Sequence, residues 1–213
     1  MKYTGRITLV LISIAASFME YLLSVEITKS EIAVDLLFTA MAWFFGGLYD
    51  KVKFLSENDP LTMLSNRRYV DKVVSSVFKK ASIDKEKLSI FLIDVDDFKL
   101  LNDTFGHMIG DKVLTAIAEH LKKNSRKTDI AARWGGDEFL MITPYMNKEE
   151  TAKFTKRMVQ TVYHGMEGDG QTKDIPICLS IGCAIFPQEG ESLDELLSIA
   201  DTRMYKMKKG NAD

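Results

Sequence analysis

Hydrophobic residues follow two different patterns along this chain. In residues 7–25 and 32–49 they are nearly continuous, and each run holds one charged residue, Glu20 or Asp35. From about residue 56 onward they recur at helical spacing or form short strand-like runs between polar turns. This change of pattern predicts two parts, an apolar segment over residues 1–55 and a second domain over residues 56–213.

Each of the two apolar runs is long enough to cross a membrane as a helix. At about 1.5 Å per residue, each reaches approximately the ~30 Å of a bilayer core. A buried helical hairpin is one alternative for both runs, and a secretory signal peptide is an alternative for the first. A domain of this size rarely buries two such helices, and no good cleavage site follows the first run. We therefore expect an uncleaved hairpin in contact with membrane lipid, with a loop over residues 26–31.

The positive charges around the runs predict an orientation. Lys2 and Arg6 precede the first run, Lys51 and Lys53 follow the second, and the loop holds only Lys29. Because basic residues are enriched on the cytoplasmic side of membrane proteins, both termini and the second domain are expected in the cytoplasm.

The second domain is expected to alternate helices and strands. Leu48, Val52 and Leu55 extend the second apolar helix as a stalk, which should break at residues 58–60. Asp59 and Pro60 suit the cap and first position of a new helix. The later pattern predicts a strand over 88–93, helices over 98–105 and 110–121, strands over 130–134 and 138–143, a helix over 148–164, a strand over 177–185 and a helix after the Ser192–Glu195 capping box. An α+β fold follows, with helices packed on a mainly antiparallel sheet.

Composition excludes several classes of protein. The chain has 213 residues, of which 46% are hydrophobic, and its 28 basic and 30 acidic residues give a net charge of −2. This balance argues against a nucleic-acid partner bound through a broad basic surface. Two cysteines exclude a disulfide-built scaffold, and we expect Cys178 and Cys183 to be small core residues in a reducing compartment.

The first chemical signal is a group of acidic residues where the strand over 88–93 ends. Asp94, Asp96 and Asp97 crowd a single turn. Like charges at such short spacing repel one another unless a cation or solvent compensates them. Taken alone, this segment is better interpreted as a solvated surface turn.

A second acidic pair changes that interpretation. Asp137 and Glu138 follow Gly135 and Gly136 in a tight hairpin. If the hairpin flanks the strand over 88–93, its turn lies beside Asp94. Carboxylate oxygens suit Mg²⁺, which retains water ligands and binds substrate phosphates, and glycines allow backbone amides to approach a phosphate closely.

Nearby residues suit a purine nucleotide. Lys99 can meet a phosphate, and Asn102 and Asp111 can bind a base edge. A carboxylate accepts two hydrogen bonds from the N1–H and exocyclic amine of guanine, a donor pair that adenine lacks. Taken singly, Asn102 serves equally well as a turn or cap residue, and Asp111 as a first-turn charge that complements a helix dipole.

The motif over residues 133–139 contains the letters GGDEF and resembles the signature of the GGDEF diguanylate cyclases. The resemblance extends in order over residues 59–209. Residues 59–68 are similar to D-x-L-T-G-L-x-N-R-R, residues 94–103 to D-x-D-x-F-K-x-x-N-D, residues 106–111 to G-H-x-x-G-D, and residues 180–182 with Ala200, Asp201, Tyr205 and Lys208 to the closing segments.

The resemblance implies a nucleotidyltransferase that condenses two GTP into cyclic di-GMP and two pyrophosphates. It implies a nucleotidyl-cyclase-like sheet of the palm or ferredoxin-like type flanked by helices. Each domain would hold one GTP, so the enzyme would act as a homodimer with Mg²⁺, or alternatively Mn²⁺. With the apolar hairpin, the expected location is the bacterial inner (cytoplasmic) membrane.

The resemblance also assigns roles to individual residues. The metal ligands would be Asp94, the Val95 carbonyl, Asp137 and Glu138, and the catalytic residues would be Asp137, which deprotonates the attacking hydroxyl, and Lys99, which stabilises phosphate charge. The substrate-binding residues would be Phe98, Asn102, His107, Asp111, Gly135, Gly136 and Lys208.

A product-inhibition site of the form R-x-x-D lies five residues before the double glycine in such enzymes. Arg126 and Asp129 occupy this offset, and Arg157 on the following helix is a supporting candidate. The chain departs from the family pattern in two places: Met63 replaces a glycine, and the arginine usual near the C-terminal Gly210 is absent.

A silent receptor for GTP or cyclic di-GMP is the alternative function. Degenerate relatives usually lose the acidic centre, whereas Asp94, Asp137 and Glu138 are all present. A cyclase with a mixed purine product is disfavoured by Asp111 as a guanine-binding residue. The sequence therefore predicts an active diguanylate cyclase.

Overall fold

The computed structural model describes residues 3–23, 28–126, 128–167 and 177–211. The chain divides into two compact units, Met1–Glu57 and Asn58–Asp213. Lys2, the last two residues of the first apolar run (24–25) and the first two of the expected loop (26–27) lie outside the described residues.

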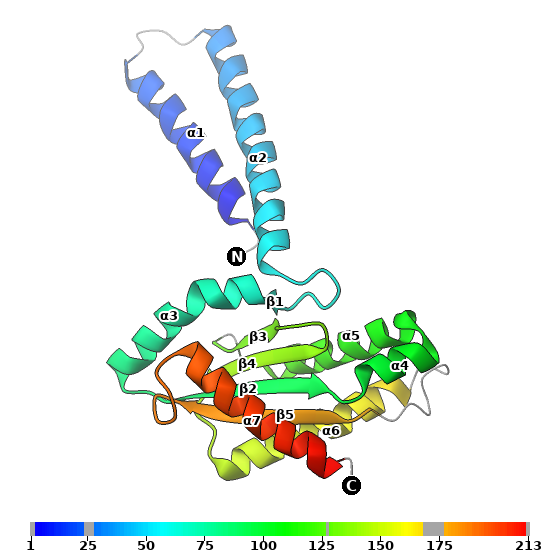
Figure 1. The fold of residues 1–213 in the computed structure, drawn as a ribbon. Helices are drawn as coiled ribbons and strands as arrows, with labels where there is room; N and C mark the ends of the chain where they lie inside the picture. Colours follow the sequence, from blue (N-terminus) through cyan, green and yellow to red (C-terminus); the bar gives the residue numbers. More distant parts are fainter. Residues whose placement is uncertain (1–2, 24–27, 127, 168–176, 212–213) are drawn as a thin grey trace. The chain divides into compact units, whose positions relative to one another are not determined.

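The first unit is a pair of helices, α1 (Thr4–Leu23) and α2 (Lys29–Glu57), which run side by side in opposite directions (Figure 1). Both are long and apolar enough to cross a membrane, and their most apolar windows are only 0% and 6% buried. Residues 29–31, expected in the loop, already belong to α2. The helix also continues to Glu57, which confirms the predicted extension beyond the second apolar run.

A polar contact joins the two helices near their ends. The Asp50 carboxylate of α2 accepts hydrogen bonds from the backbone N–H groups of Gly5 (2.7 Å) and Arg6 (3.2 Å) in the first turn of α1. Farther along, the Ser13 and Thr39 hydroxyl oxygens lie 3.2 Å apart. Asp50 therefore satisfies donors that the first turn of a helix otherwise leaves unpaired.

The second unit is built on a five-stranded sheet with strand order β1-β3-β4-β2-β5. The strands are β1 (Ser65–Asn66), β2 (Leu88–Val95), β3 (Ile130–Arg133), β4 (Glu138–Pro144) and β5 (Leu179–Phe186). The β1–β3 pair is parallel, and the other neighbouring pairs are antiparallel. The expected α+β fold class is confirmed. The two-residue strand β1 was not expected.

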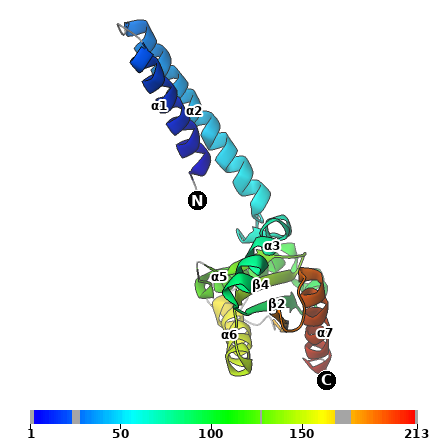
Figure 2. The same ribbon diagram turned by 90° about the vertical axis from the view of Figure 1, so that its left-hand side faces the viewer.

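Helices cover both faces of this sheet (Figure 2). They are α3 (Arg67–Asp84), α4 (Phe98–Phe105), α5 (His107–Asn124), α6 (Lys148–Glu167) and α7 (Leu193–Asn211). Residues of α3 and α7 pack with Ile90 and Leu92 of β2, whereas residues of α4, α5 and α6 pack with Phe91 and Ile93. Because side chains alternate along a strand, Asp94 continues the face covered by α3 and α7.

The predicted start of the first helix in this unit is wrong. Helix α3 begins at Arg67, and the Asn66 side chain caps it by accepting from the Tyr69 N–H at 3.0 Å. The Asp59 carboxylate instead accepts from the backbone N–H (2.9 Å) and hydroxyl (2.7 Å) of Thr62. These bonds close a turn and use the carboxylate that was expected to cap a helix.

The expectation of two core cysteines is wrong for one of them. Cys178 is exposed and precedes β5, whereas Cys183 is partly buried in that strand and packs against the core. Burial raises the pKa of the Cys183 thiol to about 11. Cys183 thus suits a core role, while Cys178 lies outside the strand in which it was expected.

Candidate active site

The two acidic segments meet at adjacent strand ends. Asp94 in β2 and Glu138 in β4 are paired across the antiparallel ladder, so their side chains share one face of the sheet. The carbonyl oxygen of Asp137 accepts from the N–H of Val95 at 3.3 Å, which continues the contact beyond the strand. The hairpin therefore brings Asp137 and Glu138 beside Asp94.

Arg133 fixes the turn that carries the second acidic pair. Its Nε and Nη2 donate to the Gly136 carbonyl at 3.1 and 2.7 Å, and its Nη1 lies 3.2 Å from Asp59 Oδ1. Both ion-paired side chains are only 17% exposed. Burial alone would raise the pKa of Asp59, but the hydrogen bonds from Thr62 and Arg133 hold it below its usual value. The guanidinium thus joins the hairpin turn to the turn that begins the domain.

Helix α7 supplies a cation to the acidic centre. It lies so close to β5 that a Cβ added at Gly182 would come 1.8 Å from the Ala200 carbonyl oxygen. Farther along the helix, Lys208 Nζ lies 2.5 Å from Asp94 Oδ1 and 3.9 Å from Asp96 Oδ1. The close approach of α7 to the sheet therefore places an ammonium group at the end of β2.

The electrostatics of the centre favour bound positive charge. Burial, then the neighbouring Asp137 and Asp96 carboxylates, raise the pKa of Asp94 against the opposing effect of Lys208. Burial and the carboxylates of Asp94 and Asp137 also raise the pKa of Glu138. Each carboxylate is thus harder to ionise beside its neighbours, and a cation among them would relieve the repulsion.

The donor set fits a divalent cation that shares its ligands with a substrate. Within the described residues, no three His, Cys, Asp or Glu side chains are gathered as a metal-binding group. Mg²⁺ commonly takes one or two carboxylates, several waters and substrate phosphates instead of a complete protein cage. Paired Asp94 and Glu138, with the Val95 carbonyl nearby, meet this requirement, and the Lys208 ammonium shows that Asp94 accommodates a cation.

The residues expected to bind nucleotide lie mostly in the two helices that follow β2. Lys99, His107 and Asp111 are exposed there, and Phe98 packs against the core. Asn102 is partly buried; its Oδ1 lies against Gly110 and has no hydrogen-bond partner among the described residues. The turn glycine Gly136 is exposed and Gly135 partly buried. The structure therefore brings Asn102 beside Gly110, the residue that precedes Asp111. Lys99 and His107 are exposed to solvent.

The expected product-inhibition residues line a pocket away from the acidic centre. Arg126 and Asp129 line a cavity of about 610 Å³, together with Arg157 of α6 and residues 143–146 at the end of β4. The Arg126 N–H donates to Asp129 Oδ2 at 2.7 Å, and the Asp129 N–H returns a bond to the Arg126 carbonyl. Because Glu138 begins β4 and this cavity lies where β4 ends, the two sites are separated by the length of the strand.

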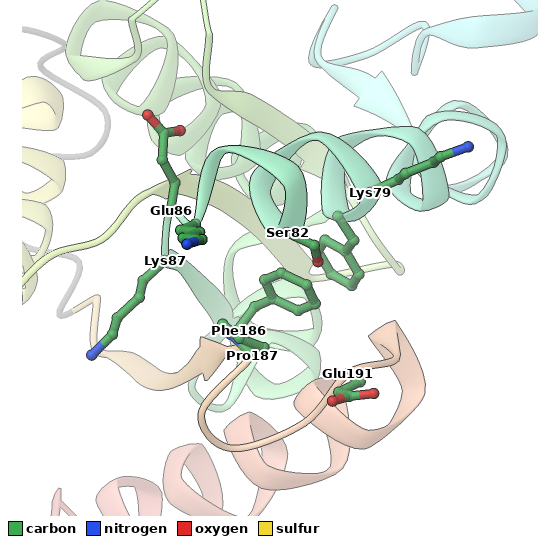
Figure 3. Close-up of a pocket in the computed structure, with 9 residues that line it drawn as sticks. Lys79, Ser82, Glu86, Lys87, Phe186, Pro187 and Glu191 are labelled. Atoms are coloured by element: carbon green, nitrogen blue, oxygen red, sulfur yellow. The ribbon is translucent and has the colours of Figure 1, made fainter.

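Another pocket holds none of the predicted site residues. Its volume is about 560 Å³, and it is lined by the end of α3, the turn between α3 and β2, the last residue of β5 and the segment after β5. The rings of Phe78 and Phe186 stack 4.4 Å apart within it, whereas Lys79, Glu86 and Lys87 point away in different directions (Figure 3). Because these charges diverge, the pocket offers no focused polar site.

Comparison with known proteins supports a nucleotide cyclase. The family model described as diguanylate cyclase, GGDEF domain, matches residues 56–213. The chain belongs to the GGDEF diguanylate cyclase family. Its GGDEF domain contains the acidic centre, the helices α4 and α5 that follow β2, and the separate Arg126 pocket.

Individual relatives share this domain. The chain is 37% identical over 161 residues to the response regulator PleD of Caulobacter vibrioides, covering 72% of this chain and 34% of PleD. It is 34% identical over 151 residues to the diguanylate cyclase DosC of Escherichia coli, covering 71% of this chain and 33% of DosC. This chain therefore spans about a third of the length of these curated relatives. A solved structure of the coiled coil and GGDEF domain of DgcB from Caulobacter crescentus, in complex with c-di-GMP, is 25% identical, has a TM-score of 0.69, and covers 85% of this chain and 96% of that chain.

Sequence reasoning missed several neighbours of the acidic centre. Ser180 Oγ donates to Asp96 Oδ1 at 2.7 Å. Asp201 of α7 adds to the repulsion that raises the pKa of Glu138, and Arg67 of α3 lowers it. All three residues stand within or next to the GGDEF family segments, but their proximity depends on how α3, α7 and β5 pack, which no local pattern reveals.

Proposed function

We propose that this chain is an active diguanylate cyclase that condenses two GTP into cyclic di-GMP with release of two pyrophosphates. The observation that carries the proposal is the intact acidic centre, in which Asp94 and Glu138 are paired and Asp137 is adjacent. These residues favour catalysis over a silent nucleotide receptor, because phosphoryl transfer depends on positioning and on neutralising phosphate charge.

In this reaction the 3′-hydroxyl of one GTP attacks the α-phosphorus of the other, and pyrophosphate leaves. Asp137 accepts the hydroxyl proton, while Lys99 and Lys208 stabilise negative charge on the phosphates. Mg²⁺, or Mn²⁺ in its place, would be held by Asp94, the Val95 carbonyl, Asp137 and Glu138, and would supply further charge neutralisation when bound.

Recognition of the nucleotide falls to the segments around this centre. Asn102 and Asp111 bind the guanine edge, because their amide and carboxylate oxygens can accept from its N–H donors. Phe98 and His107 line the nucleotide pocket, and the flexible backbone of Gly135 and Gly136 lets amides approach the phosphates.

The proposed reaction requires two chains. Each domain holds one GTP, and the two bonds that close the cyclic product form between nucleotides on facing domains. A homodimer of half-sites is therefore the catalytic unit, and activity depends on how often two domains meet.

We assign residues 1–55 to a membrane hairpin and stalk, and residues 56–213 to the cyclase domain. The support for this assignment is the pair of apolar helices, whose apolar side chains are largely exposed. The charges at the outer ends of the helices favour both termini in the cytoplasm, at the inner membrane of a bacterium.

The cavity beside Arg126 and Asp129 is the proposed site of product inhibition by cyclic di-GMP. Arg157, Lys153 and Lys156 add positive charge to its lining. Arginine suits this role because its guanidinium can form paired hydrogen bonds with a phosphate or a guanine edge.

Substitution in the acidic centre tests the proposed chemistry. We expect Asp94→Asn and Asp137→Asn each to lower cyclic di-GMP formation at least about 100-fold, because each removes a charge required in phosphoryl transfer. The measurement is initial rate with GTP and Mg²⁺, with unchanged circular dichroism as evidence of folding. Asp84→Asn, at the exposed end of α3, is the matched control. Near-normal turnover in either site variant would contradict the assignment.

A further inference from the structure

Lys208 occupies the position where a cation bound by Asp94 would sit. Its Nζ lies 2.5 Å from Asp94 Oδ1 and 3.9 Å from Asp96 Oδ1. The two aspartate side chains are only 12% and 9% exposed, whereas the lysine side chain is 39% exposed. The ammonium therefore enters from the solvent side and neutralises carboxylates that are largely buried.

The lysine and a divalent cation compete for the same carboxylate. The carboxylate has enough lone pairs for both, but an ammonium and a divalent metal ion held on one carboxylate lie close together and repel each other. Asp96 receives a hydrogen bond from Ser180 Oγ and belongs to the same cluster of carboxylates as Asp94. Binding of a metal at Asp94 therefore favours movement of the Lys208 side chain away from the carboxylate.

The Lys208 side chain is long, flexible and partly exposed, so it can make that movement. It lies near the end of α7, and its flexible four-carbon side chain can turn about several bonds while the helix stays in place. The helix itself is held by the close contact at Gly182 and by Arg203, which forms an ion pair with Glu189 at 2.6 Å. The expected change is thus confined to one side chain.

We propose that Lys208 is an exchangeable counter-ion of the metal site. The ammonium neutralises Asp94 before the metal binds, and the metal displaces it toward the phosphates of the nucleotide. This inference rests on the proposed function and links metal binding to substrate binding. The metal releases the Lys208 ammonium, which then binds the phosphates of the nucleotide. Lys208 consequently weakens metal binding in the absence of nucleotide and favours nucleotide binding once the metal is present.

Titration with Mn²⁺ in the absence of nucleotide tests this exchange. Free Mn²⁺ is measured by electron paramagnetic resonance for the full chain purified in detergent. We expect Lys208→Met to bind Mn²⁺ about tenfold more tightly than the unsubstituted chain, because the competing charge is removed. Lys208→Arg, which retains the charge, should not show this gain. Lys206→Met, an exposed lysine on the same helix, should bind as the unsubstituted chain does.

The outcomes separate this inference from the proposed function. Equal or weaker Mn²⁺ binding by Lys208→Met, or no binding by either chain, overturns the exchange. Asp94→Asn should abolish the binding that Lys208→Met strengthens. If Asp94→Asn binds Mn²⁺ normally, the metal centre itself is misplaced and the exchange falls with it. If Asp94→Asn loses binding while Lys208→Met shows no gain, only the exchange is wrong.

Discussion

Met63 adopts a backbone conformation that favours glycine. Its φ is +55°, and its side chain is 52% exposed, so packing gives little compensation. A non-glycine residue in the left-handed region costs roughly 1–2 kcal/mol. The family pattern has a glycine at this position, and the structure supplies the physical reason: the turn between Asp59 and Asn66 needs a positive φ there.

Substituting Met63 with glycine should therefore stabilise the domain. We expect Met63→Gly to raise the free energy of unfolding by about 1 kcal/mol, since relief of strain exceeds the added entropy of the unfolded chain. Urea unfolding followed by circular dichroism measures the effect. Met108→Gly, at an exposed position in α5, should instead destabilise by up to about 1 kcal/mol. Equal losses in both variants would show that Met63 is not strained.

At the scale of elements, β4 separates two sites with different proposed roles. Glu138 begins the strand, and residues 143–146 at its far end line the Arg126 cavity. The six steps from Glu138 to Pro144, at about 3.3 Å each, give a separation of roughly 20 Å. A change in the cavity should therefore leave the acidic centre intact.

Arg126→Ala should relieve inhibition by cyclic di-GMP without lowering the initial rate. The variant removes a guanidinium from the cavity and alters no residue at the acidic centre. The measurement is initial rate against added cyclic di-GMP, with Arg68→Ala on the exposed side of α3 as control. Inhibition of Arg126→Ala at the same product concentration as the unsubstituted chain would refute the site.

Most elements were predictable because their patterns are local. The apolar run of β2, the β3–β4 hairpin around the double glycine and the Ser192–Glu195 capping box all follow from short stretches of sequence. The strand β1 could not be predicted, because two residues carry no hydrophobic pattern of their own. The start of α3 was misjudged because Asp59 resembles a helix cap, whereas its actual partners include Arg133, 74 residues away.

The acidic centre was predictable in its residues but not in its ion pairs. Acidic residues at a strand end and in a hairpin turn suggested that Asp94, Asp137 and Glu138 would meet. The contact of Lys208 with Asp94 joins residues 114 positions apart and depends on the packing of α7 against β5. Such a contact follows only from tertiary structure.

At the scale of the whole molecule, the proposed hairpin raises the chance that two cyclase domains meet. Confinement in a membrane increases the effective concentration of one domain near another. A fragment of residues 56–213 should therefore be less active than the intact chain in membranes at equal concentration. Replacing residues 1–55 with a parallel dimeric coiled coil in suitable register should restore activity. Equal rates for the bare fragment and the intact chain at low concentration would leave the hairpin as an anchor only.

We expect this chain to make cyclic di-GMP from GTP. Its most direct test is to incubate the purified chain with GTP and Mg²⁺ and identify the products by mass spectrometry, with a parallel sample in which a chelator removes the metal. We expect cyclic di-GMP and two equivalents of pyrophosphate in the first sample, and neither in the second. Unchanged GTP in both samples, or a product other than cyclic di-GMP, would contradict it.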